Sequence, residues 1–353
     1  MSPRERILAA IDRKPVDRIP SDIWATPEIW LALKQHFGTD DQWVIRDKLG
    51  IDSIDGPGLA YTGKDRTARD GTQTGIWGTR YQEQPLPTGG VYSEQVFYPL
   101  KDATDVRALD DFNWENPADY DYVAAGAFCR EACKRHAISA GYAAPFVDLW
   151  MLFGQEMALM NLALRPELIE ATLQRTMAYR LEQQRLLFEV TKGCVDITQV
   201  TDDFGSQNGL VMSLGTVRSI FWPHYRNAIK LARSYGIRVF HHDDGAMSEL
   251  IPDLIEMGVA VINPIQWRCP GMELGRLKRD FGQRIAFHGS IDNQYVIPFG
   301  TTEEIRAEVR KNLRLLGSDG TGFIIAPCHS IQSGTPLDNV LAIYDEIQRQ
   351  GAG

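Results

Sequence analysis

The stretch GIRVFHHDDG, residues 236–245, joins a short apolar run to four ionisable side chains and a glycine. An amphipathic stretch at 213–236 leads into it, and a second apolar run, AVINP, follows at 260–264. This unit of helix, strand and polar strand end recurs along most of the chain. Strands that alternate with helices in this way indicate parallel pairing through right-handed crossovers.

Six strands are expected from residue 137 onward, separated by helical patterns such as those at 166–190, 213–236 and 301–317. The strands are AISAGYA (137–143), VDITQV (195–200), IRVF (237–240), AVINP (260–264), IAFHG (285–289) and FIIAP (323–327). Upstream, IPSDIW (19–24) and IDSID (51–55) supply two more. About eight such strands favour an α/β fold, the closed (β/α)8 TIM barrel, over an open doubly wound sheet. No GxGxxG follows a strand to support a dinucleotide-binding fold.

No linker divides the chain, so residues 1–353 are expected to form a single barrel domain. Residues 56–120 are rich in Gly, Asp, Pro and aromatics and poor in periodicity. They are interpreted as an irregular insertion near the N-terminus that covers the barrel mouth. The stretch DLWMLFGQEMALMNL (148–162) is expected to be a buried helix that packs on the barrel.

Composition narrows the class of protein. The chain has 44% hydrophobic and 24% charged residues, as globular proteins do, and a formal charge of -9 without a basic block, so nucleic acid is a poor partner. No segment reaches the roughly 18 apolar residues of a membrane helix, and no signal peptide is recognisable. We therefore expect a cytoplasmic protein. Five cysteines, an odd number without a CxxC pair, argue against a disulfide scaffold.

Reactive groups of such barrels come from the C-terminal ends of the strands and the loops that follow. Four of the seven histidines fall at these ends, namely His241, His242, His288 and His329. Barrel geometry brings distant strand ends to one rim. We therefore expect Asp203, His242, Asp244, His288 and His329 to converge on one pocket.

His242 and Asp244 are two residues apart, so on an extended segment both side chains point the same way. Together with His329 they can supply three ligands to one metal and leave a position open for substrate. Zinc suits this set, and ferrous iron uses the same one. The alternative is that Asp243 or Asp244 caps a helix starting near Ala246, with the histidines bonded to neighbouring strands.

At these residues the chain resembles the uroporphyrinogen decarboxylase superfamily, which includes the decarboxylase and the zinc-dependent methyltransferases of corrinoid systems. The resemblance runs over nearly the whole length, and the family's fold is the (β/α)8 barrel. The segments that carry it are RERILAAIDRKPVDRIP, DDFGSQ, GIRVFHHDDG, GVAVINPIQ, RIAFHGSID, PFGTTEEIRAEV and GFIIAPCHSIQSGTPLDNVLAIY.

The resemblance is closer to the methyltransferase branch than to the decarboxylase. The decarboxylase binds its tetrapyrrole carboxylates through an arginine-rich segment, RPVWxMRQAGR, where this chain has SDIWATPEIWLAL without any arginine. The methyltransferases bind zinc through a His-x-Cys and a later Cys before a TP dipeptide. His242, Asp244 and His329 occupy those three positions. Cys328 lies one residue before the position of the family's second cysteine. His329 also matches a histidine of the decarboxylase.

The resemblance also implies roles for other residues. Asp203, His288 and His329 are the candidate catalytic residues, and HGSID resembles a family loop that lines the pocket. Substrate contacts are assigned to Phe204, Gln207, Gln266, Trp267 and Asp292, with Trp24 and Glu156, beside Asp22, as a far wall. The implied cofactors are zinc or another divalent metal and a corrinoid. Since the chain lacks a corrinoid-binding DxHxxG motif, a separate corrinoid protein is the implied partner.

Three functions remain open. The first is a zinc-dependent methyltransferase that moves a methyl group between a small substrate, such as an O-methyl compound, and the corrinoid protein. Asp and His in place of thiolates donate less charge, so the metal is a stronger Lewis acid and suits O-demethylation. The second is a metal-independent decarboxylase or other lyase of a small carboxylic acid, using Asp203 and His329. The third is a non-catalytic barrel that only binds a ligand. A monomer or homodimer fits each of these functions.

Overall fold

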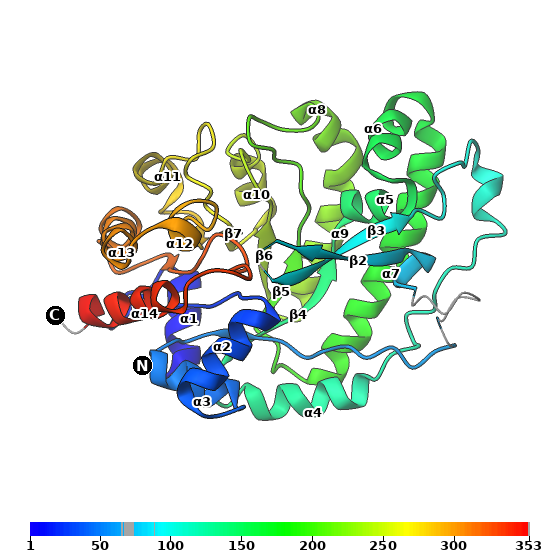
Figure 1. The fold of residues 1–353 in the computed structure, drawn as a ribbon. Helices are drawn as coiled ribbons and strands as arrows, with labels where there is room; N and C mark the ends of the chain where they lie inside the picture. The colour runs from blue at the N-terminus through cyan, green and yellow to red at the C-terminus, as the bar shows by residue number, and fades with distance from the viewer. Residues whose placement is uncertain (65, 67–73, 88, 352–353) are drawn as a thin grey trace.

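A sheet of parallel strands lies at the centre of the protein (Figure 1), whose computed structural model describes residues 1–64, 66, 74–87 and 89–351. Seven strands form one sheet in the order β1-β4-β5-β6-β7-β8-β9, each parallel to its neighbour. Their bounds are β1 Ile54–Asp55, β4 Ala137–Ala143, β5 Ile197–Val200, β6 Arg238–His242, β7 Val261–Asn263, β8 Ala286–His288 and β9 Phe323–Ile324. The six strands expected from residue 137 onward are all present, and the barrel-type fold is confirmed.

The segment at 19–26 connects the two edges of this sheet. On one side, Ile325 N donates to Pro20 O at 2.9 Å and Asp22 N donates to Ile325 O at 3.0 Å. On the other side, Ser53 N donates to Ser21 O at 3.1 Å. The segment therefore takes the place of an eighth strand, although it forms only isolated bridges. Ser53 has φ +65°, which interrupts the extended backbone and limits the strand expected at 51–55 to its last two residues.

Helices surround the strands (Figure 1). Their bounds are α1 Pro3–Ile11, α2 Pro27–Phe37, α3 Gln42–Leu49, α4 Tyr122–Ala132, α5 Pro145–Phe153, α6 Gln155–Leu164, α7 Pro166–Thr191, α8 Leu214–Thr216, α9 Trp222–Ser234, α10 Ile251–Met257, α11 Leu274–Phe281, α12 Val296–Phe299, α13 Thr302–Leu316 and α14 Leu337–Gly351. Capping boxes start α1 and α13. The single helix expected at 148–162 is two helices, because Gly154 at φ +79° separates α5 from α6. Among the described residues no helix is long and apolar enough to cross a bilayer.

Helix α1 closes the N-terminal end of the barrel. Its Ile7, Ala10 and Ile11 are at most 1% exposed and pack with inward-facing strand residues such as Ile197 and Phe240. A second and larger apolar layer fills the space between the strands and the outer helices. With the N-terminal end plugged by apolar side chains, the polar C-terminal strand ends are left to form a site.

The insertion contains an antiparallel hairpin of β2 (Arg80–Leu86) and β3 (Gly90–Phe97), which the sequence pattern did not indicate. Near one end, Gln95 Nε2 donates to Met151 O of α5 at 2.8 Å. Near the other, the backbone of Gly90 lies against Ser333 in the loop after β9. The hairpin thus spans the C-terminal side of the barrel. Other positions of the insertion, 65, 67–73 and 88, lie outside the described residues.

Candidate metal centre

The side chains of FHHDDG alternate in direction because the segment is extended. Strand β6 continues two residues further than expected, through His242. His241 and Asp243 are fully buried, whereas the side chains of His242 and Asp244 are 17% and 41% exposed. His241 Nδ1 bonds to Val200 O at 3.0 Å. Only His242 and Asp244 therefore face the barrel mouth.

His242, Asp244 and His329 form a compact cluster there. One ligand atom from each, a ring nitrogen or a carboxylate oxygen, lies within 4.8 Å of the others. His242 Nε2 is 3.8 Å from Asp244 Oδ1, which also accepts a hydrogen bond from Gln266 Nε2 at 3.3 Å. The ring of Trp24 packs against both histidines, with centroid distances of 5.7 and 6.3 Å. Strand ends far apart in sequence thus deliver two imidazoles and one carboxylate to one point.

These three residues fit a divalent metal. A tetrahedral zinc ion with ligands at about 2.0–2.1 Å needs its donor atoms about 3.4 Å apart, which small side-chain rotations achieve here. The opposite ring nitrogen of His242, Nδ1, bonds to Asn263 Oδ1 at 2.5 Å. Metal-bound histidines usually donate their second N–H in this way. Three protein ligands leave a further coordination position for substrate.

The carboxylates of Asp244 and Asp203 also favour a bound cation. Burial raises the pKa of Asp244 above its usual value, the neighbouring His242 and His329 lower it, and the charge of Asp203 raises it. One carboxylate oxygen of Asp203 is buried and has no hydrogen-bond donor among the described residues. Two neighbouring carboxylates at a partly buried site are stabilised by a cation between or beside them.

Two glycines allow the loop at 201–207 to contact the end of β6. A Cβ atom on Gly205 would lie 2.1 Å from the carbonyl oxygen of Asp244. A Cβ on Gly245, which has φ +85°, would lie 2.3 Å from the carbonyl oxygen of Ser206. The glycines of DDFGSQ and HHDDG therefore permit a close backbone approach that places Asp203 and Asp244 beside each other.

The aspartate at these strand ends that caps a helix is Asp202, not Asp243 or Asp244. Asp202 accepts hydrogen bonds from the first turn of α5, at Phe146 N and Val147 N, and burial raises its pKa well above the usual value. The alternative that Asp243 or Asp244 caps a helix near Ala246 is wrong, because α10 starts at Ile251. Asp243 instead accepts from the backbone N–H groups of Phe204 and Gly205.

Several other expected site residues lie away from the cluster. Phe204 is fully buried and stacks on Phe146, so it belongs to the core. Trp267 donates to Glu308 and lies beneath Lys311, and Asp292 pairs with Arg268. Gln207 and Glu156 are exposed, the latter in the first turn of α6. Of the expected substrate contacts, only Gln266 and Trp24 touch the cluster.

His288 lies behind the cluster rather than in the pocket. It is fully buried, and both of its ring nitrogens are engaged, Nδ1 with Asn263 and Nε2 with Asp22. A direct proton transfer from His288 to substrate is therefore blocked in this arrangement. Strand β8 continues through His288, so its side chain stays within the barrel wall.

Sequence reasoning missed two residues near the cluster. Asn263, at the end of β7, contacts both His242 and His288, and the only signal was its place at a strand end before Pro264. Cys269 is buried, lies 3.7 Å from Gln207 Oε1 through its Sγ, and has a pKa raised by burial and by the charge of Asp244. Cys328, which was considered, donates instead to Ile265 O at 3.4 Å, and burial raises its pKa.

A cavity of about 220 Å³ lies inside the barrel next to Trp24. Its wall is formed by Asp22, Trp24, Ile54, Asp55, Gly56, Ser139, Gln199 and Phe240. Trp24 is shared between this cavity and the cluster, since its ring also contacts His242 and His329. A small molecule in the cavity is thus one aromatic ring away from the candidate ligands.

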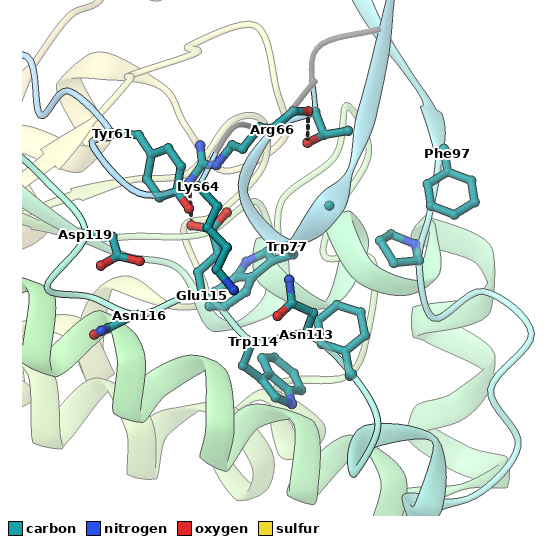
Figure 2. A pocket seen from close by; sticks show the side chains of 15 residues that line it. Tyr61, Lys64, Arg66, Trp77, Phe97, Asn113, Trp114, Glu115, Asn116 and Asp119 are labelled. Carbon is teal, nitrogen blue, oxygen red and sulfur yellow. Dashed lines mark hydrogen bonds and ion pairs between the residues drawn. The ribbon is translucent and has the colours of Figure 1, made fainter. Parts of the chain in front are cut away.

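A larger cavity of about 460 Å³ lies within the insertion (Figure 2) and is lined by none of the cluster residues. Figure 2 shows Arg66 beside Tyr61 and Glu115 at one side and Trp77 and Trp114 at another. The guanidinium carbon of Arg66 is 3.5 Å from the centroid of the Tyr61 ring, and Arg66 also bonds to Glu115. Of the two basic residues that line this cavity, Arg66 is therefore already paired within the protein, whereas Lys64 is a second cation of the lining.

A family model for uroporphyrinogen decarboxylase (URO-D) matches residues 86–350. The chain belongs to this family. The matched range contains His242, Asp244 and His329, together with Asn263 and His288. No curated protein matches the chain significantly.

Comparison with solved structures shows that the fold of nearly the whole chain is shared with another protein. A methyltransferase from Methanosarcina mazei has a TM-score of 0.65 at 18% sequence identity, with 99% of each chain covered. The native xylanase 10B from Thermotoga maritima has a TM-score of 0.42 at 12% identity, covering 67% of this chain and 82% of that chain. The first likeness shows that the URO-D barrel, including its first 85 residues, is a shared fold. The resemblance expected from the sequence is confirmed.

Proposed function

We propose that this URO-D family member is a metal-dependent methyltransferase that transfers the methyl group of a small O-methyl compound to a separate corrinoid protein. The observation that carries the proposal is the cluster of His242, Asp244 and His329, beside an internal cavity. The methyltransferase from Methanosarcina mazei, similar over 99% of the chain, supports the general class.

The ligand set favours an oxygen-bound methyl group. Two imidazoles and a carboxylate donate less charge than thiolates, so a bound zinc ion would act as a Lewis acid toward a substrate oxygen. Cys328 does not provide a thiolate, since its sulfur is buried against Ile265 O. Cys269 lies nearby, but its raised pKa keeps it a neutral thiol.

The internal cavity suits an uncharged substrate. Trp24 and Phe240 supply apolar walls, and Ser139 and Gln199 supply hydrogen-bonding groups. Its lining includes the Asp22 carboxylate, while Asp55 is paired with Arg46, and none of the lining residues, all within the described part of the chain, is Lys or Arg. A volume of about 220 Å³ accommodates a compound the size of a small methyl ether.

Asp203 can complete the proton balance. In the proposed transfer the C–O bond would break, the methyl group would pass to the reduced corrinoid of the partner, and the substrate oxygen would have to gain a proton. One oxygen of Asp203 is buried and unpartnered among the described residues. In its protonated form this carboxyl can supply the proton, and in its charged form it can orient a donor on the substrate.

The alternative lyase has less support from the cavity. A decarboxylase of a small acid needs a cation to hold the substrate carboxylate, and the lining of the cavity includes the Asp22 carboxylate but no Lys or Arg. His329 and Asp203 would serve that reaction as proton donor and charge stabiliser. The two functions therefore differ in their requirement for metal and in the charge of their substrate.

The proposal is tested by incubating zinc-loaded protein with chemically reduced cobalamin and 2-methoxyphenol, and by following methylcobalamin by its absorption spectrum. We expect methyl transfer that disappears when zinc is removed with a chelator and returns when zinc is added back. His329→Ala should abolish transfer, whereas His36→Ala, which changes an exposed histidine on α2, should not. Transfer that is unaffected by zinc removal would contradict the assigned role of the cluster. Release of carbon dioxide from a small acid without metal would favour the lyase.

A further inference from the structure

A line of buried polar side chains runs from His242 into the barrel. His242 Nδ1 is 2.5 Å from Asn263 Oδ1, and Asn263 Nδ2 is 2.8 Å from His288 Nδ1. His288 Nε2 is in turn 3.1 Å from Asp22 Oδ2. Asn263 and His288 are 0% exposed and Asp22 is 1% exposed. Three neighbouring strand ends and the segment that closes the barrel thus contribute one residue each.

The direction of every hydrogen bond in this line follows from groups that can only donate or only accept. Asp22 already accepts from two obligate donors, the backbone N–H of Ile54 at 3.2 Å and the indole N–H of Trp24 at 3.1 Å. Toward His288 it also accepts, so Nε2 of His288 carries the hydrogen. In a neutral imidazole the other nitrogen, Nδ1, is then an acceptor.

The orientation of the Asn263 amide then determines which ring nitrogen of His242 carries the hydrogen. Its amide nitrogen donates to His288 Nδ1 and also lies 3.3 Å from the carbonyl oxygen of His288, which can only accept. The amide oxygen therefore faces His242, whose Nδ1 must be the protonated nitrogen. Nε2 of His242 is left with its lone pair, 3.8 Å from Asp244 Oδ1 in the candidate metal centre.

We propose that Asp22, His288 and Asn263 are positioning residues that hold His242 in the Nδ1–H tautomer, so that Nε2 is always presented as a metal ligand. The role of these three residues in metal binding rests on the proposed function of the cluster. The tautomer of His242 follows from the hydrogen bonds alone. A carboxylate bonded to the second nitrogen of a ligating histidine fixes ring orientation and raises ligand basicity. Here the carboxylate acts across two intervening side chains.

The first test reads the tautomers directly in metal-free protein. Long-range proton–nitrogen NMR spectra of uniformly labelled protein distinguish the two ring nitrogens of each histidine. We expect His242 as Nδ1–H and His288 as Nε2–H. Asn263→Leu removes the acceptor of His242 Nδ1, so His242 should no longer be held as Nδ1–H and its Nε2–H tautomer should appear.

The second test measures zinc affinity by chelator competition. Asn263→Leu removes the acceptor for His242 and should weaken zinc binding by about 10–100-fold. Asn263→Asp keeps an acceptor toward His242 and should weaken it less. Asn339→Leu is the matched control, since Asn339 is also buried and donates to two carbonyl groups but lies on α14, outside the line. Circular dichroism and denaturation of each variant report folding separately.

The outcomes separate this inference from the proposed function. His242 found as Nε2–H in the metal-free parent would overturn the inference, as would an unchanged single tautomer of His242 in Asn263→Leu. Equal loss of zinc affinity in the Asn263 and Asn339 variants would overturn it too, because it would indicate general destabilisation. The expected tautomers in a parent that binds no zinc would support the inference and contradict the metal centre.

Discussion

Replacing Gly245 by Ala tests how the backbone builds the cluster. Gly245 has φ +85°, and a Cβ there would lie 2.3 Å from Ser206 O. An L-residue in the left-handed region costs about 1–2 kcal/mol. Moving Ser206 O away also disrupts its 2.8 Å hydrogen bond from Ala246 N, which is worth about 0.5–1.5 kcal/mol. Together these terms predict a loss of about 2–3 kcal/mol in the free energy of unfolding.

Gly236 provides a matched control before the same strand. It has φ +71°, and a Cβ there meets nothing within 4 Å. Gly236→Ala should therefore cost only the backbone strain of about 1–2 kcal/mol. It should also leave zinc affinity unchanged, because no contact near Asp244 moves. Gly245→Ala should lose both stability and zinc affinity.

Urea denaturation and zinc titration of the two variants supply the measurements. The excess loss of stability in Gly245→Ala over Gly236→Ala isolates the contact with Ser206. If both variants lose the same stability and bind zinc as the parent does, the close approach of the two loops does not position Asp244. The reasoning about the glycines would then be refuted.

Three further predictions concern buried charges and ligand chemistry. Arg180→Met leaves the buried Asp148 carboxylate without its ion-pair partner and should cost about 3–5 kcal/mol by denaturation, while exposed Arg185→Met on the same helix should cost little. Asp202 has a raised pKa, so the folded state binds more protons than the unfolded state. Stability should therefore fall as pH rises above about 4, the usual pKa of an unfolded aspartate, and Asp202→Asn should flatten this slope in urea titrations. Asp244→Cys adds a soft thiolate and should raise the affinity for cadmium relative to zinc by about 10-fold or more in competition titrations; an unchanged ratio would place Asp244 outside the metal's ligands.

The local sequence pattern was sufficient to predict the strands from residue 137 onward and two of the three cluster residues, His242 and Asp244. Alternation in FHHDDG predicted that His242 and Asp244 share a direction, and the structure brings them to His329 within 4.8 Å. This works because a period of two residues is a property of any extended backbone. The β2–β3 hairpin was missed because much of β3 is exposed, so no apolar alternation marks it.

Other assignments failed because they depend on packing that only the folded chain defines. Phe204 follows a strand as a pocket residue would, but its ring stacks on Phe146 and packs at an angle against Phe221 in the core. His288 also stands at a strand end, yet Asn263 and Asp22 occupy both of its nitrogens. Residues of three separate segments meet in that network, so no spacing in the sequence could reveal it.

Metal content is the measurement that tests the account most directly. Protein purified without chelator or nickel affinity resin should contain about one zinc per chain by mass spectrometry, as a single three-ligand site requires. His242→Ala and His329→Ala should lose that metal, and His36→Ala should retain it. A folded parent that contains no metal, even after incubation with zinc, iron or cobalt, would contradict the ligand assignment of His242, Asp244 and His329.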